Sequence, residues 1–221
     1  ILVEYLDAHP EVGLVGPQLY YEDGSLQTSA YSDPSLLRMI YKITGLAKLT
    51  HQRSPLRRWL LKIGLGRLLN IDSLRTITTP ERVDVVKGAV MVVRRDAYLQ
   101  VGGMDASMKA YAEEFDWQWR LRQHGWQIVL VPEAKVTHFG LGQALLTLQG
   151  ERLYYDRLGI LTYFLKHRSW WQAMIIRLVM LISHTFWGLI WLVFNRERAS
   201  VHFKIVKMAF TWYYPFAAAK S

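Results

Sequence analysis

Short apolar runs alternate with turn signals at the start of the chain. Ile1–Leu6 has the pattern of a helix, which we interpret as the end of an element already in progress in a longer protein. Val12–Val15 predicts a buried strand, which Gly16-Pro17 should end before a second extended piece at Gln18–Tyr21. Asp23-Gly24 then predicts a hairpin into the residues that follow.

The centre of the chain predicts more strands and a short helix. Val83–Val86 and Ala89–Val93 have the composition of buried strands, and Gly88 between them lets backbone or ligand approach closely. Asp96 is placed to cap a short helix that ends at Gly102-Gly103.

A longer helix and two extended pieces follow. Ala112–His124 has helical spacing, with Gly125 placed as its C-terminal stop. Trp126–Val131 predicts a strand, and Pro132 should break it before an extended piece at Ala134–His138. Helices and strands mixed in this order indicate an α/β fold.

Residues 34–80 interrupt this pattern, and up to about Leu69 they are helical, amphipathic and basic. Arg57, Arg58, Lys62 and Arg67 stand there among leucine, isoleucine and tryptophan residues. Such a stretch can lie on a membrane surface. It can equally be a solvated insertion packed on the domain, and the sequence leaves both interpretations open.

The C-terminal part is far more apolar. Trp170–Phe194 would form a helix roughly 37 Å long, against a bilayer core of about 30 Å, but Arg177 interrupts it. The part beyond Arg177, Leu178–Phe194, would be only about 25 Å long. Its tryptophans and the flanking basic residues are typical of a membrane interface. We therefore expect membrane association, either across the bilayer or on its surface.

Composition narrows the possible partners. The 221 residues are 51% hydrophobic, so the chain can bury a real core. Cysteine is absent, which excludes disulfides and leaves histidine or carboxylate as metal ligands. A net charge of +9 suits nucleic acid, an anionic membrane surface or a phosphorylated substrate. The basic residues lie beside apolar runs and form no groove-reading motif, so we expect no nucleic-acid partner.

Three carboxylates open the helix predicted at Ala112–His124. Glu113, Glu114 and Asp116 lie where the helix dipole favours negative charge, so ordinary capping can explain them. Crowded carboxylates also raise at least one pKa, which suits a general base near neutral pH. His138 ends a predicted strand, where it can be structural or a metal ligand.

Several segments, in this order, resemble family 2 inverting glycosyltransferases of the GT-A fold. They are His9–Pro17 with Asp23-Gly24, Val85–Arg95, Val101–Asp105, Tyr111–Asp116, Arg120-Leu121 with Gly125-Trp126, and Val131–His138. Within that family, they are most similar to the rhamnosyltransferase-like branch that builds bacterial cell-surface polysaccharide. The resemblance covers about residues 1–145.

The resemblance implies roles for individual residues. Glu114 stands at the position of the catalytic base, where the family has Asp, and Glu113 is the alternative. Asp116 matches a second acidic residue of the catalytic motif that orients the helix, and His138 matches a histidine that helps to hold Mg²⁺ or Mn²⁺. The residues expected to bind substrate are Gly88, Ala89, Trp117 and Arg120.

The resemblance also implies an architecture and an activity. Residues 1–165 would be the acceptor-side, C-terminal half of a GT-A mixed sheet, and residues 166–221 a membrane-associated helical tail. The protein would transfer a sugar, with inversion, from a nucleotide-sugar donor to a hydroxyl of a glycan or lipid-linked glycan. It would act at the cytoplasmic face of the inner (plasma) membrane.

One family motif has no counterpart in the chain. The family holds its metal with an Asp-x-Asp motif upstream of the matched region, and these 221 residues contain no such sequence. We therefore expect the donor-binding half to lie outside this chain, and the isolated chain to be inactive. The same observation allows an alternative, a non-catalytic membrane-bound scaffold for polysaccharide assembly.

Overall fold

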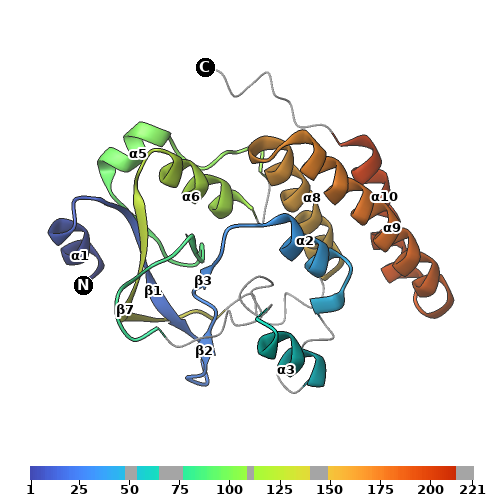
Figure 1. Ribbon diagram of the computed structural model, residues 1–221, viewed down its shortest axis with the longest axis horizontal. Helices are drawn as coiled ribbons and strands as arrows, with labels where there is room; N and C mark the ends of the chain where they lie inside the picture. Colours follow the sequence, from blue (N-terminus) through green and yellow to red (C-terminus); the bar gives the residue numbers. More distant parts are fainter. Residues whose placement is uncertain (48–53, 65–76, 109–111, 140–148, 213–221) are drawn as a thin grey trace. The chain divides into compact units, whose positions relative to one another are not determined.

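The computed structural model describes residues 1–47, 54–64, 77–108, 112–139 and 149–212. They belong to two compact units (Figure 1). The sheet unit comprises residues 1–33, 70–107 and 113–142, and the helical unit comprises 34–69, 108–112 and 143–221. Most of the predicted insertion therefore groups with the C-terminal helices.

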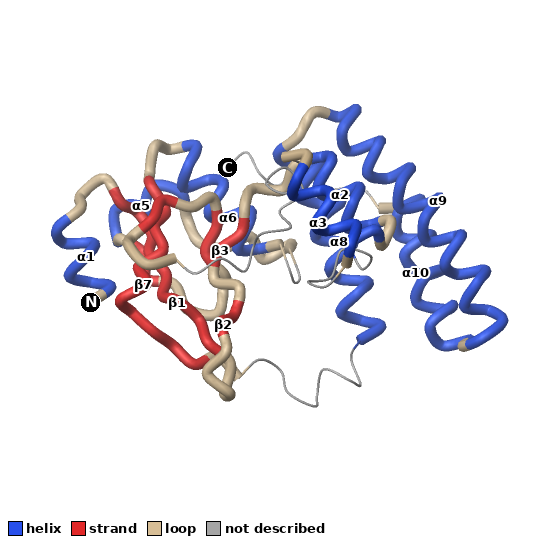
Figure 2. Tube along the Cα trace, turned by 60° about the horizontal axis from the view of Figure 1, so that its bottom comes forward, coloured by secondary structure: helices blue, strands red, loops and turns tan. Residues whose placement is uncertain are grey.

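A mixed sheet forms the centre of the sheet unit. Its strands are β1 (Val12–Tyr20), β2 (Leu26–Gln27), β4 (Glu81–Arg82), β6 (Val92–Val93) and β7 (Gln127–Thr137). The order is β2-β1-β7-β4, and β6 also pairs with β1. Strands β1 and β7 run side by side in parallel, whereas the other pairs are antiparallel (Figure 2). The predicted α/β class is confirmed as a mixed α/β arrangement.

The prolines expected to break two strands lie inside them instead. Strand β1 continues through Pro17, and β7 continues through Pro132. The ladder pairs Pro17 with Val131 and then Gln18 with Lys135, so it skips Pro132–Ala134. Because proline donates no N–H to a ladder, the shift in register lets both strands pass it. The predicted breaks are therefore wrong, and the turn signals mark an irregularity within continuous strands.

The predicted hairpin is confirmed. Strand β2 pairs antiparallel with the end of β1, and Gly24 at the turn has a φ of +77°. The Asp23 carboxylate accepts a hydrogen bond from the Ser25 N–H at 2.9 Å, which fixes the turn.

The strands predicted around Gly88 are shorter than expected. Only β5 (Val85–Val86) and β6 are regular, and a turn at Gly88-Ala89 separates them. Strand β5 pairs with β3 (Ala30–Tyr31) in a separate two-stranded sheet.

Helices cover both faces of the mixed sheet (Figure 1). Helices α5 (Arg95–Val101) and α6 (Glu113–Gln123) share one core with Ile128 and Leu130 of β7, while α1 (Leu2–Ala8) shares the other with Val129 and Val131. Because β7 is covered on both faces, Ile128–Val131 is apolar at every position and does not alternate.

The start of α5 differs from the prediction, and its end agrees with it. Arg94 occupies the N-cap position and Asp96 lies in the first turn, so the predicted cap at Asp96 is wrong. The Arg94 guanidinium instead donates hydrogen bonds to the carbonyl oxygens of Leu6, His9 and Val12. The helix ends at Gly102, whose φ of +73° lies in the left-handed region that favours glycine.

The described part of the helical unit has two short and three long helices. They are α2 (Leu36–Ile43), α3 (Pro55–Lys62), α8 (Gln149–His167), α9 (Trp170–Phe194) and α10 (Arg196–Thr211). Of these, α2, α8, α9 and α10 pack against one another. Asn195 links α9 to α10, and its side chain caps α10 by accepting from the Arg198 N–H at 2.9 Å. Helix α2 is fixed to α9 by two side-chain bonds, from Ser183 to the Ile43 carbonyl and from Trp187 to the Thr44 carbonyl.

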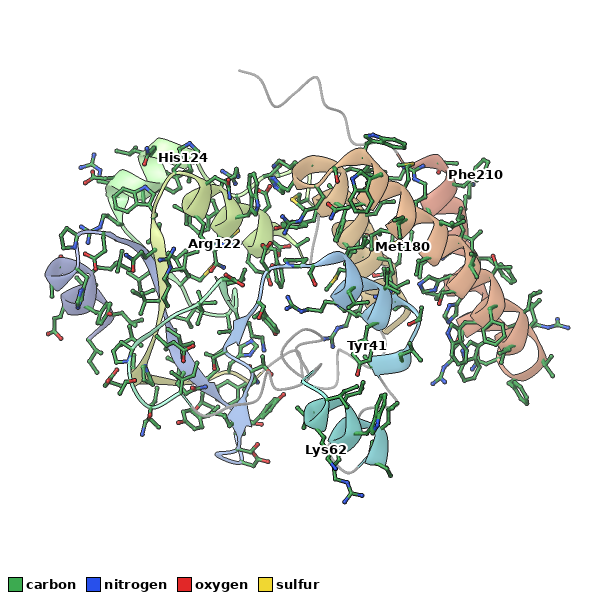
Figure 3. All side chains as sticks on the ribbon, in the orientation of Figure 1. Tyr41, Lys62, Arg122, His124, Met180 and Phe210 are labelled. Atoms are coloured by element: carbon green, nitrogen blue, oxygen red, sulfur yellow. The ribbon has the colours of Figure 1, made fainter. Side chains whose placement is uncertain are left out.

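Helix α9 has one packed face and one exposed apolar face. The packed face includes Ala173, Ile176 and Met180, which are fully buried (Met180 is labelled in Figure 3). The exposed residues, spaced three or four apart, form a stripe of Trp171, Met174, Leu178, Ile182, Phe186, Leu189 and Val193. Among the described helices, α9 is the one whose length and apolar composition would suffice to cross a membrane.

Arg177 finds its partners at the end of the neighbouring helix. Its guanidinium donates to the carbonyl oxygen of Trp212 at 2.7 Å and to that of Phe210 at 3.4 Å. These carbonyls lie at the C-terminus of α10, where the helix dipole favours a cation. The arginine that interrupts the apolar sequence therefore has a structural role in joining α9 to α10.

Candidate functional site

Two sides of helix α6 face the rest of the sheet unit, and each carries polar side chains. Glu114, Gln118 and Leu121 are spaced four and three residues apart, so they share one side of the helix. Leu121 and Gln118 on that side are completely buried. Glu114, one turn before Gln118 and half-buried, therefore lies at the edge of the same packed surface.

Gln118 joins α6 to strand β5. Its side-chain oxygen accepts from the Val86 N–H at 2.8 Å, and its side-chain nitrogen donates to the Val86 carbonyl at 2.8 Å. Val86 also packs closely against Gly16 of β1, because a Cβ on Gly16 would lie 2.9 Å from the Val86 Cβ. The glycine in β1 thus allows a close approach that fixes the end of β5.

The turn after β5 brings Gly88 against Glu114. A Cβ built on Gly88 would lie 3.5 Å from the Glu114 Cβ and 3.7 Å from its carboxyl carbon. Ala89 follows in the same turn. Residues that lie 26 positions apart in the sequence are therefore neighbours here, and Gly88 places no side chain against Glu114.

His138 is held by the β2 hairpin strand. Its Nδ1 lies 2.7 Å from the Gln27 side-chain oxygen, which also accepts a hydrogen bond from the Lys87 ammonium at 2.7 Å. The Gln27 side-chain nitrogen donates to the His138 carbonyl at 3.2 Å. Because the Gln27 oxygen can only accept, His138 must carry its proton on Nδ1, and Nε2 keeps a lone pair.

Burial and the Lys87 charge both lower the pKa of His138 below its usual value. A neutral imidazole with its Nδ1–H bound to an oxygen is the form in which histidine binds a metal through Nε2. Among the described residues, however, no group of three His, Asp or Glu side chains could hold a metal ion. His138 thus fits one ligand position, and these residues do not complete a metal site.

The polar residues on a second side of α6 stabilise the loop after α5. Asp116 is completely buried and pairs with Arg120, whose Nη2 lies 2.9 Å from its carboxylate. The Arg120 guanidinium also donates to the carbonyls of Val101 and Gly103, and the Trp117 indole N–H donates to that of Gly102 at 2.8 Å. These contacts are structural, and substrate binding by Trp117 and Arg120 stays a prediction. Glu113, in the first turn, is half-buried.

The predicted residues therefore fall into two groups. Glu114, Gly88 and His138 are linked through Lys87 and Gln27, and we call these five residues the site cluster. The second group joins α6 to the loop after α5 and consists of Asp116, Trp117 and Arg120. Sequence reasoning missed Gln118, Lys87 and Gln27. The spacing of Gln118 from Glu114 could have indicated the first, whereas Gln27 reaches the cluster only through the register of the hairpin.

Comparisons with known proteins support part of this picture. The chain is 33% identical over 138 residues to N-acetylglucosaminyl-diphospho-decaprenol L-rhamnosyltransferases from two strains of Mycobacterium tuberculosis. The aligned part is 62% of this chain and 40% of those proteins, so the chain spans well under half of their length. No family model matches the chain, and no solved structure matches it. The predicted resemblance to rhamnosyltransferase-like glycosyltransferases is confirmed at this level.

Proposed function

We propose that the chain is the acceptor-side part of an inverting family 2 glycosyltransferase with a GT-A sheet. It would move a sugar from a nucleotide-sugar donor to a hydroxyl group of a lipid-linked glycan in the synthesis of cell-surface polysaccharide. The similarity to enzymes named as rhamnosyltransferases that act on a diphospho-decaprenol glycan supports this activity. The donor-binding part would lie outside these 221 residues, and the isolated chain would not turn over.

The observation that carries the proposal is the position of Gly88 beside Glu114, whose carboxyl carbon would lie 3.7 Å from a Cβ at residue 88. In an inverting displacement, the acceptor hydroxyl loses its proton as it attacks the sugar, and a positioned carboxylate takes that proton. The Glu114 carboxylate is the base in this proposal. Gly88 has no side chain to fill the space beside it, so an acceptor hydroxyl can approach.

His138 is the residue that would hold a divalent cation, through Nε2. Bound Mg²⁺ or Mn²⁺ would offset the negative charge that develops on the departing nucleoside diphosphate. The Lys87 ammonium, which shares Gln27 with His138, would add a second positive charge on the same side. Its part in the proposal is electrostatic attraction of the donor phosphates.

Membrane association is also part of the proposal. The exposed stripe on α9 gives the helical unit an apolar surface, and basic residues flank that helix at Arg168, Arg196 and Arg198. We place the unit at the cytoplasmic face of the membrane, with the stripe toward the lipid. The alternative, a membrane-bound scaffold without catalysis, would use the same surface and would not need Glu114.

The Glu114→Gln variant of the full-length enzyme distinguishes the transferase from the scaffold without catalysis. We expect the variant to fold normally and to lose roughly 10²- to 10⁴-fold in transfer, measured with membranes and a radiolabelled nucleotide sugar. Asp116→Asn is the matched control, because it alters the buried ion pair with Arg120 and should lower stability. Full transfer by Glu114→Gln would place the base elsewhere, and no transfer by the unaltered enzyme would favour the scaffold.

A further inference from the structure

Helices α9 and α10 form an antiparallel pair, joined by Asn195. Gly188 of α9 lies against Phe203 of α10, where an added Cβ would be 3.0 Å from a ring carbon. Farther from the turn, the Arg177 guanidinium donates to the Trp212 carbonyl at 2.7 Å. Because each contact joins residues at similar distances from the turn, α10 lies beside α9 from Asn195 back to Arg177 (Figure 1). A membrane that receives this part of α9 must therefore accommodate α10 as well.

The outer side of α10 is polar. Its exposed residues, spaced three or four apart, are Glu197, Ser200, Lys204, Lys207 and Thr211. Counted from the first residue of α10, Lys204 and Lys207 lie roughly 12 Å and roughly 17 Å along the helix. The part of α9 that α10 accompanies is about 25 Å long. Both lysines are therefore placed beside the middle of the most apolar part of the chain.

Helix α8 and helix α2 bring further charged groups to the packed side of α9. The Arg157 guanidinium of α8 donates from Nε to the Nε2 of His184 in α9 at 3.1 Å. Arg157 also pairs with the Asp156 carboxylate, which in turn lies 2.6 Å from the Lys42 ammonium of α2. Helix α9 is thus one member of a bundle whose other helices carry charges.

These charges are incompatible with α9 crossing the bilayer in this bundle. A charged side chain at the depth of the hydrocarbon is costly unless it faces the protein interior or a water-filled cavity. Lys204 and Lys207 are exposed instead. A helix in the plane of the membrane avoids this cost, because only its apolar face enters the lipid, to a depth of about 5–10 Å. The exposed stripe of α9 provides such a face.

Both ends of α9 carry residues that suit the membrane–water boundary. Trp170 and Trp171 begin the helix and are exposed, and Arg168 precedes them. Arg196 and Arg198 follow at the other end and are also exposed. Tryptophan favours the headgroup level, and arginine is attracted to anionic lipids. A helix that lies flat brings both ends to the same leaflet, where each can contact headgroups.

We propose that α9 lies in the plane of the membrane and does not cross it, so that both of its ends and α10 stay on one side. The stripe enters one leaflet, and the polar side of α10 remains in water or among headgroups. This inference rests on the membrane association proposed above, and it decides between the two positions that the sequence leaves open.

Single-cysteine labelling tests the proposal, because the chain has no cysteine of its own. Ser169→Cys and Ser200→Cys each replace an exposed serine, one before α9 and one just beyond the turn into α10. Ile182→Cys places a thiol in the stripe. Bacterial cells that express the full chain supply inside-out membrane vesicles and intact spheroplasts. A membrane-impermeant maleimide is added to each preparation.

We expect Ser169→Cys and Ser200→Cys to react to the same extent in inside-out vesicles and to be protected in spheroplasts. Ile182→Cys should react roughly tenfold more slowly than Ser200→Cys until detergent removes the lipid, because the bilayer shields its thiol. Ser200→Cys is the matched control for Ile182→Cys, since both side chains are exposed in the isolated chain.

The other outcomes overturn the proposal in distinguishable ways. Labelling of Ser169→Cys and Ser200→Cys from opposite sides shows that α9 crosses the membrane, which contradicts the flat position and leaves the proposed membrane association standing. Protection of both thiols in both preparations also contradicts the flat position. Rapid labelling of Ile182→Cys without detergent removes the stripe from the lipid, and contradicts the proposed membrane association as well.

Discussion

The side-chain amide of Gln118 pairs with both backbone polar groups of Val86, at 2.8 Å each. The amide thus occupies the place that another strand would take beside β5. Gly88 follows Val86 by two residues, and Glu114 precedes Gln118 by one helical turn. This pair of hydrogen bonds therefore sets how closely Gly88 and Glu114 approach each other.

Replacing Gln118 should disturb both stability and the site cluster. In Gln118→Leu, the N–H and C=O of Val86, a residue only 1% exposed, lose their partners. Each unsatisfied group costs about 1–3 kcal/mol, so we expect the two together to lower the free energy of unfolding by roughly 2–6 kcal/mol. Chemical denaturation followed by circular dichroism measures this change.

The control for Gln118→Leu is Gln123→Leu. Gln123 lies in the last turn of the same helix and is exposed, so its replacement should change the unfolding free energy by less than about 0.5 kcal/mol. Equal stability of the two variants would show that the bonds to Val86 contribute little, and that the approach of Gly88 to Glu114 has another cause.

The lowered pKa of His138 predicts that the stability of the fold depends on pH. Its folded-state pKa is lowered, first by burial and then by the Lys87 charge, relative to an unfolded value near 6.5. As the pH falls below about 6.5, the unfolded chain takes up the proton first. The stabilisation is therefore complete above that pH and is lost as the pH falls through the folded value.

This dependence can be assigned to His138 by substitution. Urea midpoints measured between about pH 7.5 and about pH 5 should fall for the unaltered chain and fall less for His138→Asn, whose amide can still donate to Gln27. His184 contributes a loss of the same sign in both proteins. Lys87→Gln removes the second cause and should also make the decline shallower. Identical pH profiles for all three proteins would contradict the lowered pKa.

The apolar stripe on α9 predicts binding to lipid vesicles. Leu189 is 57% exposed, so Leu189→Asp should leave the fold intact while placing a charge in the surface that we direct toward lipid. Burying a leucine contributes about 1.5–3 kcal/mol, so vesicle association should fall by roughly tenfold or more. Co-sedimentation with phosphatidylcholine vesicles that contain an anionic lipid measures the effect.

Leu99→Asp provides the comparison for the stripe. Leu99 is 65% exposed on α5, in the sheet unit, and makes no part of the stripe. We expect this variant to bind vesicles as the unaltered chain does. An equal loss for both variants, or no vesicle binding by the unaltered chain, would rule out the stripe as the membrane-facing surface.

The sequence predicted those elements whose signals are local. Helix α6 ends beside Gly125, at a φ of +88°, and the hairpin turns at Gly24, because a left-handed backbone needs glycine wherever the chain folds. The breaks expected at Pro17 and Pro132 failed for a non-local reason. The strands continue because β7 leaves Pro132–Ala134 out of the ladder where it passes Pro17 of β1, and a single sequence carries no information about which strand will pair there.

The acidic residues of α6 show the same division between what local sequence signals predict and what packing decides. Their order along the chain placed Glu113, Glu114 and Asp116 at a helix start, and the resemblance to a known family suggested roles. The sequence could not tell that Asp116 is completely buried against Arg120 while Glu114 lies beside Gly88. The rotation of α6 about its axis decided that, and packing of Leu121 and Gln118 against the sheet unit fixes the rotation.

By itself, the sequence determined the α/β class, the approximate bounds of α6 and α9 and the residue types available for chemistry, since these follow from local periodicity and turn preferences. Tertiary structure alone decided which of those residues meet. Gln27 and Lys87 reach His138, and Arg157 reaches His184, through contacts between segments far apart in the chain. Such contacts depend on how hydrophobic faces pack, which no local pattern specifies.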